Sequence, residues 1–518
     1  MTRSEQGPVR RPVTVRGGAA RVAARMAAHA GDTGWFWLDG EAAAHSIPAD
    51  GALAAEDALS YLGIAAELVV AEPGAERAFL DRISGAAAPA PESRSAADSV
   101  PSRGFTSGWV AALGYEFGEA LLGLPGRPEA TEPGGAEPAP AFALRADVVL
   151  AVTGEQGELR ADSEAEIDAW LAAHGAVLAA PRADRDQVRG DAPEALGSEP
   201  HALGSAPDAL RSASSAERAA GARWRQDDRA YAAAVEGCKD AIREGDAYVI
   251  CLTDTLSART RFDPVELFLR LRAQGGAMRA GVIVAPGRAL VSASPERFLS
   301  VRDGQITTHP IKGTRPRGVT AASDAALAEA LRADPKERAE NLMIVDLMRN
   351  DLSRVCMPGT VAVPSFLRVE THPHVHQLVS TVTGALRPGL GAADAIAACF
   401  PGGSMTGAPK RRAVEILRGV EAGPRGLYAG CFGWLDRSGD AELAMTIRSV
   451  EYPEGAGAPH RGSGPAQQGG SELGGAALHA GFAVRIGAGG GITADSRADA
   501  EVAEKHLKAA ALLRALGR

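Results

Sequence analysis

Residues 279–313 read RAGVIVAPGRALVSASPERFLSVRDGQITTHPIKG, and this stretch decides the fold class. Its segments RAGVIVAP, ALVSAS and RFLSVRDGQITTHPIKG have the composition of strands and are separated by short breaks. Connections this short join neighbouring antiparallel strands, so the stretch predicts a meander. Because strands come in runs and helices lie outside those runs, we expect an α+β fold rather than a βαβ repeat.

Helices are predicted on both sides of the meander. DDRAYAAAVEGCKDAIREG (227–245) has apolar residues at helical spacing, and the strand-like AYVICLT (247–253) follows it. KERAENLMIVDLMRNDLSRVC (336–356) predicts an amphipathic helix. We expect that helix to turn four apolar side chains toward a core: Leu342, Val345, Met348 and Leu352. SRADAEVAEKHLKAAALLRAL (496–516) predicts a last helix.

The first part of the chain has weaker signals. GWFWLDG, AAELVVAE and FTSGWVAALGYEFGEALLG predict strands and turns with a helix or two. Four stretches rich in small residues predict loops, linkers or insertions: about 84–103, 124–141, 180–222 and 452–475. The last of these separates LAMTIRSVEY from ALHAGFAVRIGAG, which we expect to be neighbouring strands. With 518 residues, the chain is predicted to form two domains, residues 1–222 and 223–518, or one large domain with embellishments.

Composition excludes several classes of protein. The net charge of -9 argues against a nucleic-acid partner, because it implies no basic surface for phosphate backbones. The five cysteines are widely spaced and form no CxxC pair, which argues against a disulfide framework or a zinc site. The chain contains neither a signal-peptide core nor a long apolar run, so we expect no membrane partner and a cytoplasmic location.

Two glutamate pairs share one spacing. Glu337 and Glu340 open one predicted helix, and Glu501 and Glu504 open another. Residues three apart lie on one helix face, so each helix can present two carboxylates to one point, as a Mg2+ site requires. Acidic residues are also common in first helical turns, and spacing alone favours that explanation.

Three other motifs are ambiguous by themselves. RIGAGGGI could approach an anion through backbone N–H groups, but Ile492 stands where a dinucleotide fingerprint needs glycine. FPGGSMTGAPK has the glycine spacing of a P-loop, but Ala408 replaces its lysine. Taken alone, each of these two motifs predicts a tight turn. AGCFG approaches a nucleophile elbow, yet a buried strand cysteine at Cys431 is the better interpretation.

Lys312 lies where a predicted strand runs into a turn. It is either a solvated lysine in a basic turn near Arg315 and Arg317, or an amine aimed into a cleft. Next to Arg315 or a metal ion, the amine would lose basicity and become a usable nucleophile. Composition leaves both alternatives open.

Eight motifs in a fixed order are more specific than any one of them. They are SPERF (294–298), PIKGT (310–314), ENLMIVDLMRNDLSRVC (340–356), VHQLVSTVTG (375–384), FPGGSMTGAPK (400–410), GLYAGCFGWLD (426–436), IRS (447–449) and GAGGGITADS (487–496). Over residues 225–516 this set resembles the chorismate-utilising enzyme family, in particular its aminodeoxychorismate synthase component I branch. The resemblance implies a large antiparallel β-sandwich of two sheets with surrounding helices, acting on chorismate with Mg2+.

The resemblance also implies roles for individual residues. It places the metal at four glutamates: Glu337, Glu340, Glu501 and Glu504. It places the substrate against Thr314, Tyr428, Arg448, Gly487, Ala488, Gly489 and Lys508. In this branch Lys312 attacks C2 of chorismate as a nucleophile, and Glu296 protonates the departing C4 hydroxyl.

Two positions set the branch apart within the family. Val249 stands where water-activating members carry a lysine base, and Gln377 stands where anthranilate synthases carry a histidine, with His376 one place earlier. The resemblance therefore implies amination at C4 without loss of pyruvate, toward 4-aminobenzoate for folate or a specialised metabolite. No GxCxGxQ glutaminase motif occurs, so ammonia is expected from a separate glutamine amidotransferase. Anthranilate synthase component I and a degenerate chorismate-binding regulator are the alternatives.

Overall fold

The protein is described by a computed structural model, which covers most of the chain. It describes residues 8–30, 33–40, 58–84, 104–127, 141–179, 221–275, 277–372, 375–454 and 481–517. Most of the four predicted loop stretches lies outside these residues. No helix within the described ranges is both long and apolar enough to span a membrane.

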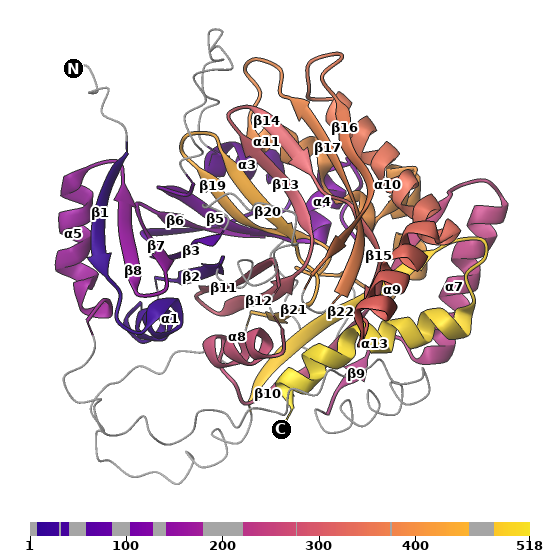
Figure 1. The fold of residues 1–518 in the computed structure, drawn as a ribbon, viewed down its shortest axis with the longest axis horizontal. Coiled ribbons are helices and arrows are strands. Elements are labelled where there is room, and N and C mark those ends of the chain that lie inside the picture. The colour runs from indigo at the N-terminus through magenta and orange to yellow at the C-terminus, as the bar shows by residue number, and fades with distance from the viewer. Residues whose placement is uncertain are drawn as a thin grey trace.

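Two antiparallel sheets form the centre of the molecule (Figure 1). Among the described residues, the first sheet has twelve strands. Their order is β1 (Val9–Thr14), β8 (Gln156–Ala161), β7 (Val148–Thr153), β3 (Ser60–Ile64), β2 (Trp35–Asp39), β11 (Arg279–Ala285), β12 (Arg288–Ser294), β21 (Ser449–Tyr452), β22 (Phe482–Ile492), β10 (Val249–Thr260) and β18 (Gly407–Ala408), with β9 (Arg223–Trp224) paired to β10.

The second sheet has ten strands in the described ranges. Their order is β15 (Ile311–Pro316), β17 (Val375–Ala385), β14 (Gln305–Thr308), β13 (Arg297–Arg302), β20 (Ala441–Met445), β19 (Cys431–Asp436), β5 (Gly108–Leu113), β6 (Ala141–Ala146) and β4 (Glu67–Val70), with β16 (Ala362–Thr371) paired to β17. Both sheets therefore take strands from both sides of residue 222.

Three apolar layers hold the sandwich together. Alternate residues of β2 show the arrangement: Phe36 and Leu38 face the second sheet, whereas Trp37 faces outward toward helices. The outer face of the first sheet is covered by α1 (Gly18–His29), α5 (Glu164–His174), α8 (Pro264–Ala273) and α13 (Ala498–Leu516). The second sheet packs against α3 (Glu76–Ser84), α4 (Tyr115–Leu121), α10 (Pro335–Ser353) and α11 (Ala392–Cys399). This confirms the predicted α+β sandwich with surrounding helices.

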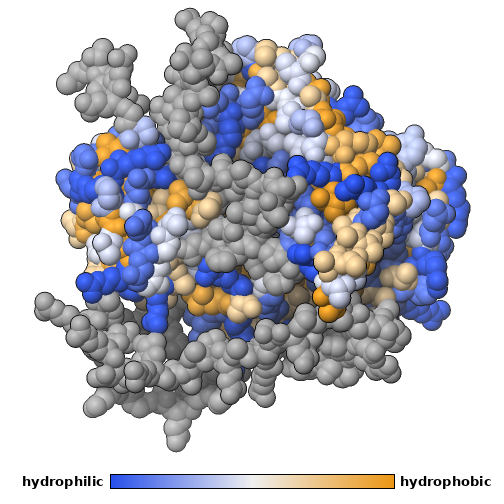
Figure 2. All heavy atoms as spheres, viewed as in Figure 1, coloured by the Kyte–Doolittle hydropathy of each residue, from blue (hydrophilic) through white to orange (hydrophobic). Residues whose placement is uncertain are grey.

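The remaining helices lie near one end of the sheets. α7 (Asp228–Arg243) and α12 (Lys410–Val420) pack against β10, and α9 (Ala321–Ala333) contacts β15, β16 and β17. On the face shown in Figure 2, hydrophilic side chains surround separate smaller apolar patches. All five cysteines are buried and unpaired, and Cys431 lies on β19 as predicted.

The predicted meander is confirmed, but it is divided between the sheets. Strands β11 and β12 belong to the first sheet, whereas β13, β14 and β15 belong to the second. The chain crosses from one layer to the other at Pro295 and Glu296, between β12 and β13. Glu296 is 8% exposed as a result, in a position between layers that sequence periodicity does not reveal.

Two predictions about local structure are wrong. Leu342 on α10 is 53% exposed, whereas Val345, Met348 and Leu352 are buried. The buried face of the helix instead includes Asn341, a polar residue that the apolar pattern passes over. FPGGSMTGAPK does form a short turn at Gly403–Met405, as expected.

The glycine-rich run is the second error, since it is extended and not a tight turn. Residues 487–491 lie inside β22 and pair with residues 251–255 of β10. Glycine is used there because other groups approach the strand closely. A Cβ atom at Gly487 would lie 2.0 Å from the Tyr428 ring, for example.

Candidate active site

Lys312 projects from a bulge in β15. The register with β17 shifts between Lys312 and Thr314, and the intervening Gly313 has φ +72°. A Cβ atom at Gly313 would lie 3.0 Å from Oε2 of Glu337, so only glycine permits this approach of α10. A bulge redirects the neighbouring side chain, which here lies half-buried.

The amine of Lys312 lies over the glycine-rich strand. A Cβ atom at Gly491 would be 3.9 Å from Nζ of Lys312, 4.0 Å from Oε2 of Glu340 and 3.6 Å from Cγ2 of Val249. The absent side chain thus leaves a space that these three groups share. The structure brings together residues from β15, α10 and β10, which the sequence placed far apart.

The other two glutamates lie beside the next glycine. A Cβ atom at Gly490 would be 2.8 Å from Oε2 of Glu501 and 3.5 Å from Oε1 of Glu504. Glu501 accepts a hydrogen bond of 2.8 Å from the Ser496 hydroxyl, and Glu504 forms a 2.5 Å ion pair with Lys508. All four predicted glutamates therefore gather along β15 and β22.

These carboxylates repel one another. Burial raises the pKa of Glu340, and the neighbouring Glu337 and Glu504 raise it further. Burial also raises the pKa of Glu501, again with a contribution from Glu504. Crowded oxygen donors suit a hard divalent cation. Nevertheless, no three His, Cys, Asp or Glu side chains of the described residues form a ready coordination shell.

Basic side chains form ion pairs with glutamates of this group. Nζ of Lys336 lies 3.8 Å from Glu340, and Arg315 lies 3.4 Å from Glu337 and 2.7 Å from Asp334. Arg315 is therefore paired with carboxylates. The four glutamates fit a cation by their chemistry, but their side chains would have to exchange these partners to bind one.

Glu296 has the properties of a proton donor. Burial between the layers raises its pKa to about 7, against the effects of a Ser404 hydrogen bond and the Lys312 charge. Its backbone is fixed by the Met445 N–H, which donates to the Glu296 carbonyl at 3.0 Å. Near neutral pH its carboxyl can therefore carry a proton, and the charge of Lys312 acts on it. Ser404, in the turn of FPGGSMTGAPK, was missed as a site residue by sequence reasoning.

Most of the predicted substrate residues also lie along β22. The Tyr428 ring covers Gly487, and Nζ of Lys508 donates to the Gly489 carbonyl at 2.7 Å. Arg448 donates to the Lys508 carbonyl at 3.4 Å and has a φ of 52°. Ala488 is buried within the strand. Thr314 stands apart, because its side chain is exposed beyond the bulge.

The neighbouring strand β17 carries two candidate polar residues, which have different partners. His376 interacts through its ring nitrogens with Thr371 and Asp324, each at 2.9 Å, and is thereby held against α9. Gln377 pairs in register with Thr314, one step from Lys312. His376 pairs with Arg315 of the same strand, so both residues lie opposite β15, and Gln377 is the one nearer to Lys312 in the register.

Asn341 is a supporting residue that the sequence did not reveal. Its fully buried amide donates to the carbonyls of Pro310 and Leu378 at 3.4 and 3.3 Å, and it accepts from the Ser380 hydroxyl at 2.6 Å. These bonds tie α10 to Pro310, immediately before β15, and to Leu378 of β17, which pairs with Lys312. Its position directly after Glu340, on the buried face of the helix, was the available signal.

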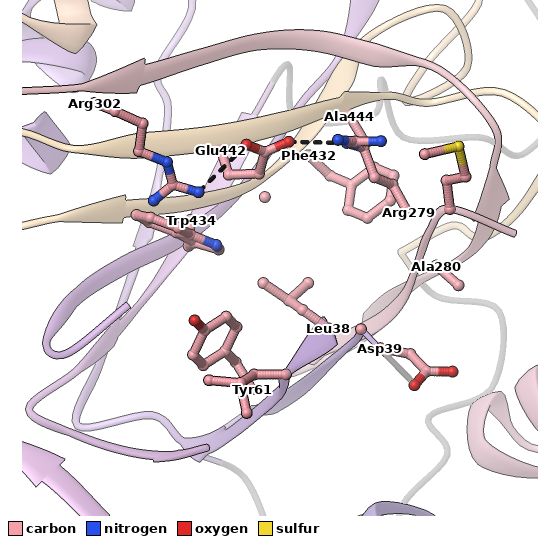
Figure 3. Close-up of a pocket in the computed structure, with 14 residues that line it drawn as sticks. Leu38, Asp39, Tyr61, Arg279, Ala280, Arg302, Phe432, Trp434, Glu442 and Ala444 are labelled. Atoms are coloured by element: carbon pink, nitrogen blue, oxygen red, sulfur yellow. Dashed lines mark hydrogen bonds and ion pairs between the residues drawn. The ribbon is translucent and has the colours of Figure 1, made fainter. Parts of the chain in front are cut away.

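A separate cavity lies between the sheets near β2, β3, β19 and β20 (Figure 3). None of the predicted site residues lines it. Glu442 accepts from Arg279 and Arg297 at 2.8 and 2.7 Å and pairs with Arg302. These arginines lower the Glu442 pKa to about 2, although burial acts in the opposite direction.

The sequence matches the profile of chorismate binding enzymes over residues 36–464. This match covers most of the chain, including the Lys312 strand and two of the four glutamates. The chain belongs to the chorismate binding enzyme family. The two C-terminal glutamates, Glu501 and Glu504, lie beyond the matched range.

Curated relatives come from two branches of this family. An aminodeoxychorismate synthase of Streptomyces pristinaespiralis is 43% identical over 55% of this chain and 36% of its own length. One from Streptomyces griseus is 35% identical over 80% of this chain and 50% of its own length. Anthranilate synthase component 1 of Mycobacterium bovis is 40% identical over 55% of this chain and 51% of its own length. The chain thus spans about half or less of these relatives.

Solved structures of the family share the fold. Anthranilate synthase component I from Streptococcus pneumoniae superposes with a TM-score of 0.62 at 23% identity, covering 99% of this chain and 94% of the other. MenF, the menaquinone-specific isochorismate synthase of Escherichia coli, gives 0.62 at 16% identity, with 98% and 94% covered. At these identities the likeness concerns architecture alone.

Proposed function

We propose that this chorismate binding enzyme aminates chorismate at C4 and releases 4-amino-4-deoxychorismate, a precursor of 4-aminobenzoate. The observation that carries the proposal is the position of the Lys312 amine. It lies over Gly491 beside Glu340, within the electrostatic reach of Glu296. An amine next to a protonated carboxyl can attack a ring while the carboxyl assists departure of a hydroxyl.

The reaction proceeds in two displacements. The neutral Lys312 amine forms a bond to C2 as the ring double bonds shift, and the C4 hydroxyl leaves as water with the Glu296 proton. Ammonia then forms a bond to C4, the double bonds shift back, and the bond between C2 and Lys312 breaks. The lysine leaves as the neutral amine, and a proton lost from the new C4 ammonium group returns to Glu296. The ring regains its original unsaturation with nitrogen in place of oxygen, and both residues are regenerated.

Charged groups around β22 would hold the substrate. Mg2+, bound by Glu337, Glu340, Glu501 and Glu504, would neutralise negative charge on the substrate carboxylates. Arg448 and Lys508 would supply cationic donors, and the Tyr428 ring would support the substrate beside Gly487. Ammonia would come from a glutamine amidotransferase partner, because a free amine nucleophile must be delivered to C4.

The test is incubation of the purified chain with chorismate, Mg2+ and ammonium at mildly alkaline pH. Products are separated by chromatography and identified by mass. The expected product has an amino group at C4 and retains its enolpyruvyl group. Glutamine should support turnover only when an amidotransferase is added, and equal glutamine-dependent activity of the chain alone would contradict the partner.

Anthranilate synthesis is the second candidate, because relatives with that name reach 40% identity. It predicts an aromatic product that has lost pyruvate. The same chromatogram separates the two candidates, since only the anthranilate reaction removes the enolpyruvyl group. Anthranilate from the wild-type chain would overturn the assignment to C4 amination.

A further inference from the structure

Tyr428 belongs to a segment with an unusual backbone. Gly426 has φ 67° and Ala429 has φ 63°, so left-handed residues lie on both sides of the tyrosine. Alanine rarely adopts this conformation, and it persists only where the surrounding structure holds it. The contacts of residues 425–429 therefore determine where the Tyr428 ring lies.

Two carboxylates hold the backbone just before Tyr428. Glu116 of α4 accepts from the Arg425 N–H at 2.7 Å and from the Gly426 N–H at 3.0 Å, one bond to each oxygen. Glu451 of β21 accepts from the Leu427 N–H at 3.3 Å. Three consecutive N–H groups thus end on side-chain oxygens. The first carboxylate comes from the weakly patterned first part of the chain.

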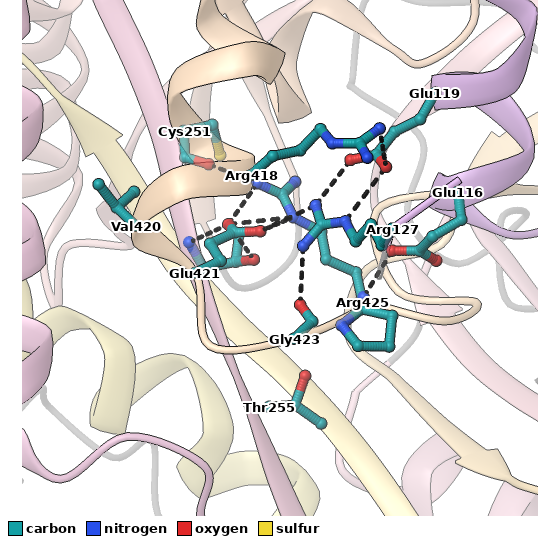
Figure 4. Close-up of polar contacts among 12 residues, drawn as sticks. Glu116, Glu119, Arg127, Cys251, Thr255, Arg418, Val420, Glu421, Gly423 and Arg425 are labelled. Atoms are coloured by element: carbon teal, nitrogen blue, oxygen red, sulfur yellow. Dashed lines mark hydrogen bonds and ion pairs between the residues drawn. The ribbon is translucent and has the colours of Figure 1, made fainter. Parts of the chain in front are cut away.

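The side chain of Arg425 anchors the start of the same segment (Figure 4). It donates to the carbonyls of Met405 and Cys251 at 2.7 and 2.8 Å and forms a 2.6 Å ion pair with Glu421. Its guanidinium lies 4.0 Å from the centre of the Tyr115 ring, next to Glu116. The Arg425 side chain is thus fixed independently of Glu116. The backbone N–H groups of Arg425 and Gly426, in contrast, are held by Glu116.

The far end of the segment faces the candidate active site. A Cβ atom at Gly487 would overlap the Tyr428 ring, and Gly487 shares β22 with Gly490 and Gly491. A shift in the backbone at 425–427 would therefore move the ring relative to the strand on which Lys312 and the glutamates converge.

We propose that Glu116 is a positioning residue for substrate binding, which acts from α4 by fixing residues 425–427 so that Tyr428 stays against Gly487. Two acceptor oxygens are needed for its two bonds. Glutamine retains the shape but supplies one acceptor and one donor, so one N–H would face an amide NH2 group. The charged groups around Glu116 are Arg127 and Glu119, with the Arg425 backbone.

Glu119 supplies a matched control on the same helix. It is 3% exposed and pairs with Arg127 at 2.6 Å and with Arg418 at 3.4 Å (Figure 4). Within the described residues, these side-chain contacts of Glu119 are to arginines and not to the 425–428 backbone. Glu119→Gln should therefore lower the melting temperature while leaving substrate affinity unchanged.

The experiment measures chorismate affinity by calorimetry in the presence of Mg2+, with the full chain. We expect Glu116→Gln to weaken chorismate binding about tenfold, as for a lost hydrogen bond to a charged group, and Glu119→Gln to change it less than about twofold. In a Tyr428→Ala background, Glu116→Gln should weaken chorismate binding little further, because the ring that Glu116 positions is absent. Equal affinities for the two glutamine variants, or full additivity with Tyr428→Ala, would overturn the proposal.

A second variant covers the case in which Glu116→Gln does not fold. Glu116→Asp retains both oxygens but is one methylene shorter, so it should weaken binding while its melting temperature stays close to that of the wild type; unchanged affinity would overturn the proposal. The inference uses the proposed function only for the identity of the ligand. A wild-type chain that binds chorismate without amination overturns the function alone, whereas amination with unaltered affinity in Glu116→Gln overturns only the positioning role.

Discussion

The charges around Arg425 are buried, whereas most of those around Lys312 are only half-buried, and the two sets are arranged differently. Glu421 accepts from the Thr253 N–H and hydroxyl at 3.0 and 2.9 Å and pairs with Arg425 at 2.6 Å. At the Lys312 site, basic side chains also lie near the glutamates, with Lys508 2.5 Å from Glu504 and Lys336 3.8 Å from Glu340, but the carboxylates crowd one another as well. Burial, with a contribution from neighbouring carboxylates, raises the pKa values of Glu340 and Glu501. Opposite charges in direct contact stabilise a fold, whereas crowded like charges are kept where a ligand can compensate them.

This difference predicts the largest effect at Lys312. Replacement by alanine should lower amination by at least about 10³-fold, since the covalent route loses its nucleophile. Product formation followed by chromatography measures the loss. Because the residue lies half-buried on a bulge, the melting temperature should change little.

Lys312→Arg is the matched control for charge. Arginine retains the positive charge but remains protonated, so it cannot act as an amine nucleophile. We expect this variant to be as inactive as Lys312→Ala. Substantial amination by Lys312→Arg would show that the site uses the charge of residue 312 and not its nucleophilicity.

The network around Arg425 should respond in the opposite way. Glu421→Gln removes one partner of a buried ion pair and should reduce the free energy of unfolding by about 3–5 kcal/mol. Denaturant unfolding at pH 7 measures this change. A loss well below 1 kcal/mol would mean that Arg425 does not depend on Glu421 for its compensation. The statement that this network stabilises the fold would then be wrong.

Glu296 should give an intermediate effect that depends on pH. Its pKa is raised to about 7, so the proton needed for departure of the hydroxyl is present below this pH and is lost above it. Glu296→Gln should lower turnover about 10²-fold, and wild-type turnover at saturating free ammonia should decline from neutral toward alkaline pH.

The control for this pH dependence is the variant itself. Residual turnover by Glu296→Gln should lack the decline, because residue 296 no longer titrates. Persistence of the same decline in the variant would assign it to another group.

The sequence predicted individual helices and strands better than the contacts between them. The strands of residues 279–313 and helix α10 follow from local patterns, and the glutamate pairs follow from helical spacing. The crossing of the chain at Pro295 could not be predicted, because strand periodicity does not say which sheet a strand joins. Asn341 and Glu116 were missed because their bonds are to backbone groups distant in sequence, which helix and strand periodicity do not encode.

The smallest predicted effect tests whether the crowded carboxylates form a cation-binding site. Glu501 is buried and its pKa is raised, so its ionised form is unfavourable in the folded state. That cost is absent below the ordinary glutamate pKa, grows as the pH rises, and is complete above the raised pKa. Glu501→Gln should therefore stabilise the metal-free protein at neutral pH by a small amount.

Thermal unfolding with and without Mg2+ measures both halves of this prediction. The wild type should gain stability from Mg2+, and Glu501→Gln should gain less, because it has lost a ligand although it begins more stable. The exposed Glu236, which pairs with Lys239 at 2.9 Å on α7, is the matched control, and its replacement by glutamine should change neither value measurably. If Glu501→Gln instead destabilises the metal-free protein as Glu421→Gln does, the Glu501 charge stabilises the fold. The distinction between charges that stabilise the fold and charges that bind a cation then does not hold at this site.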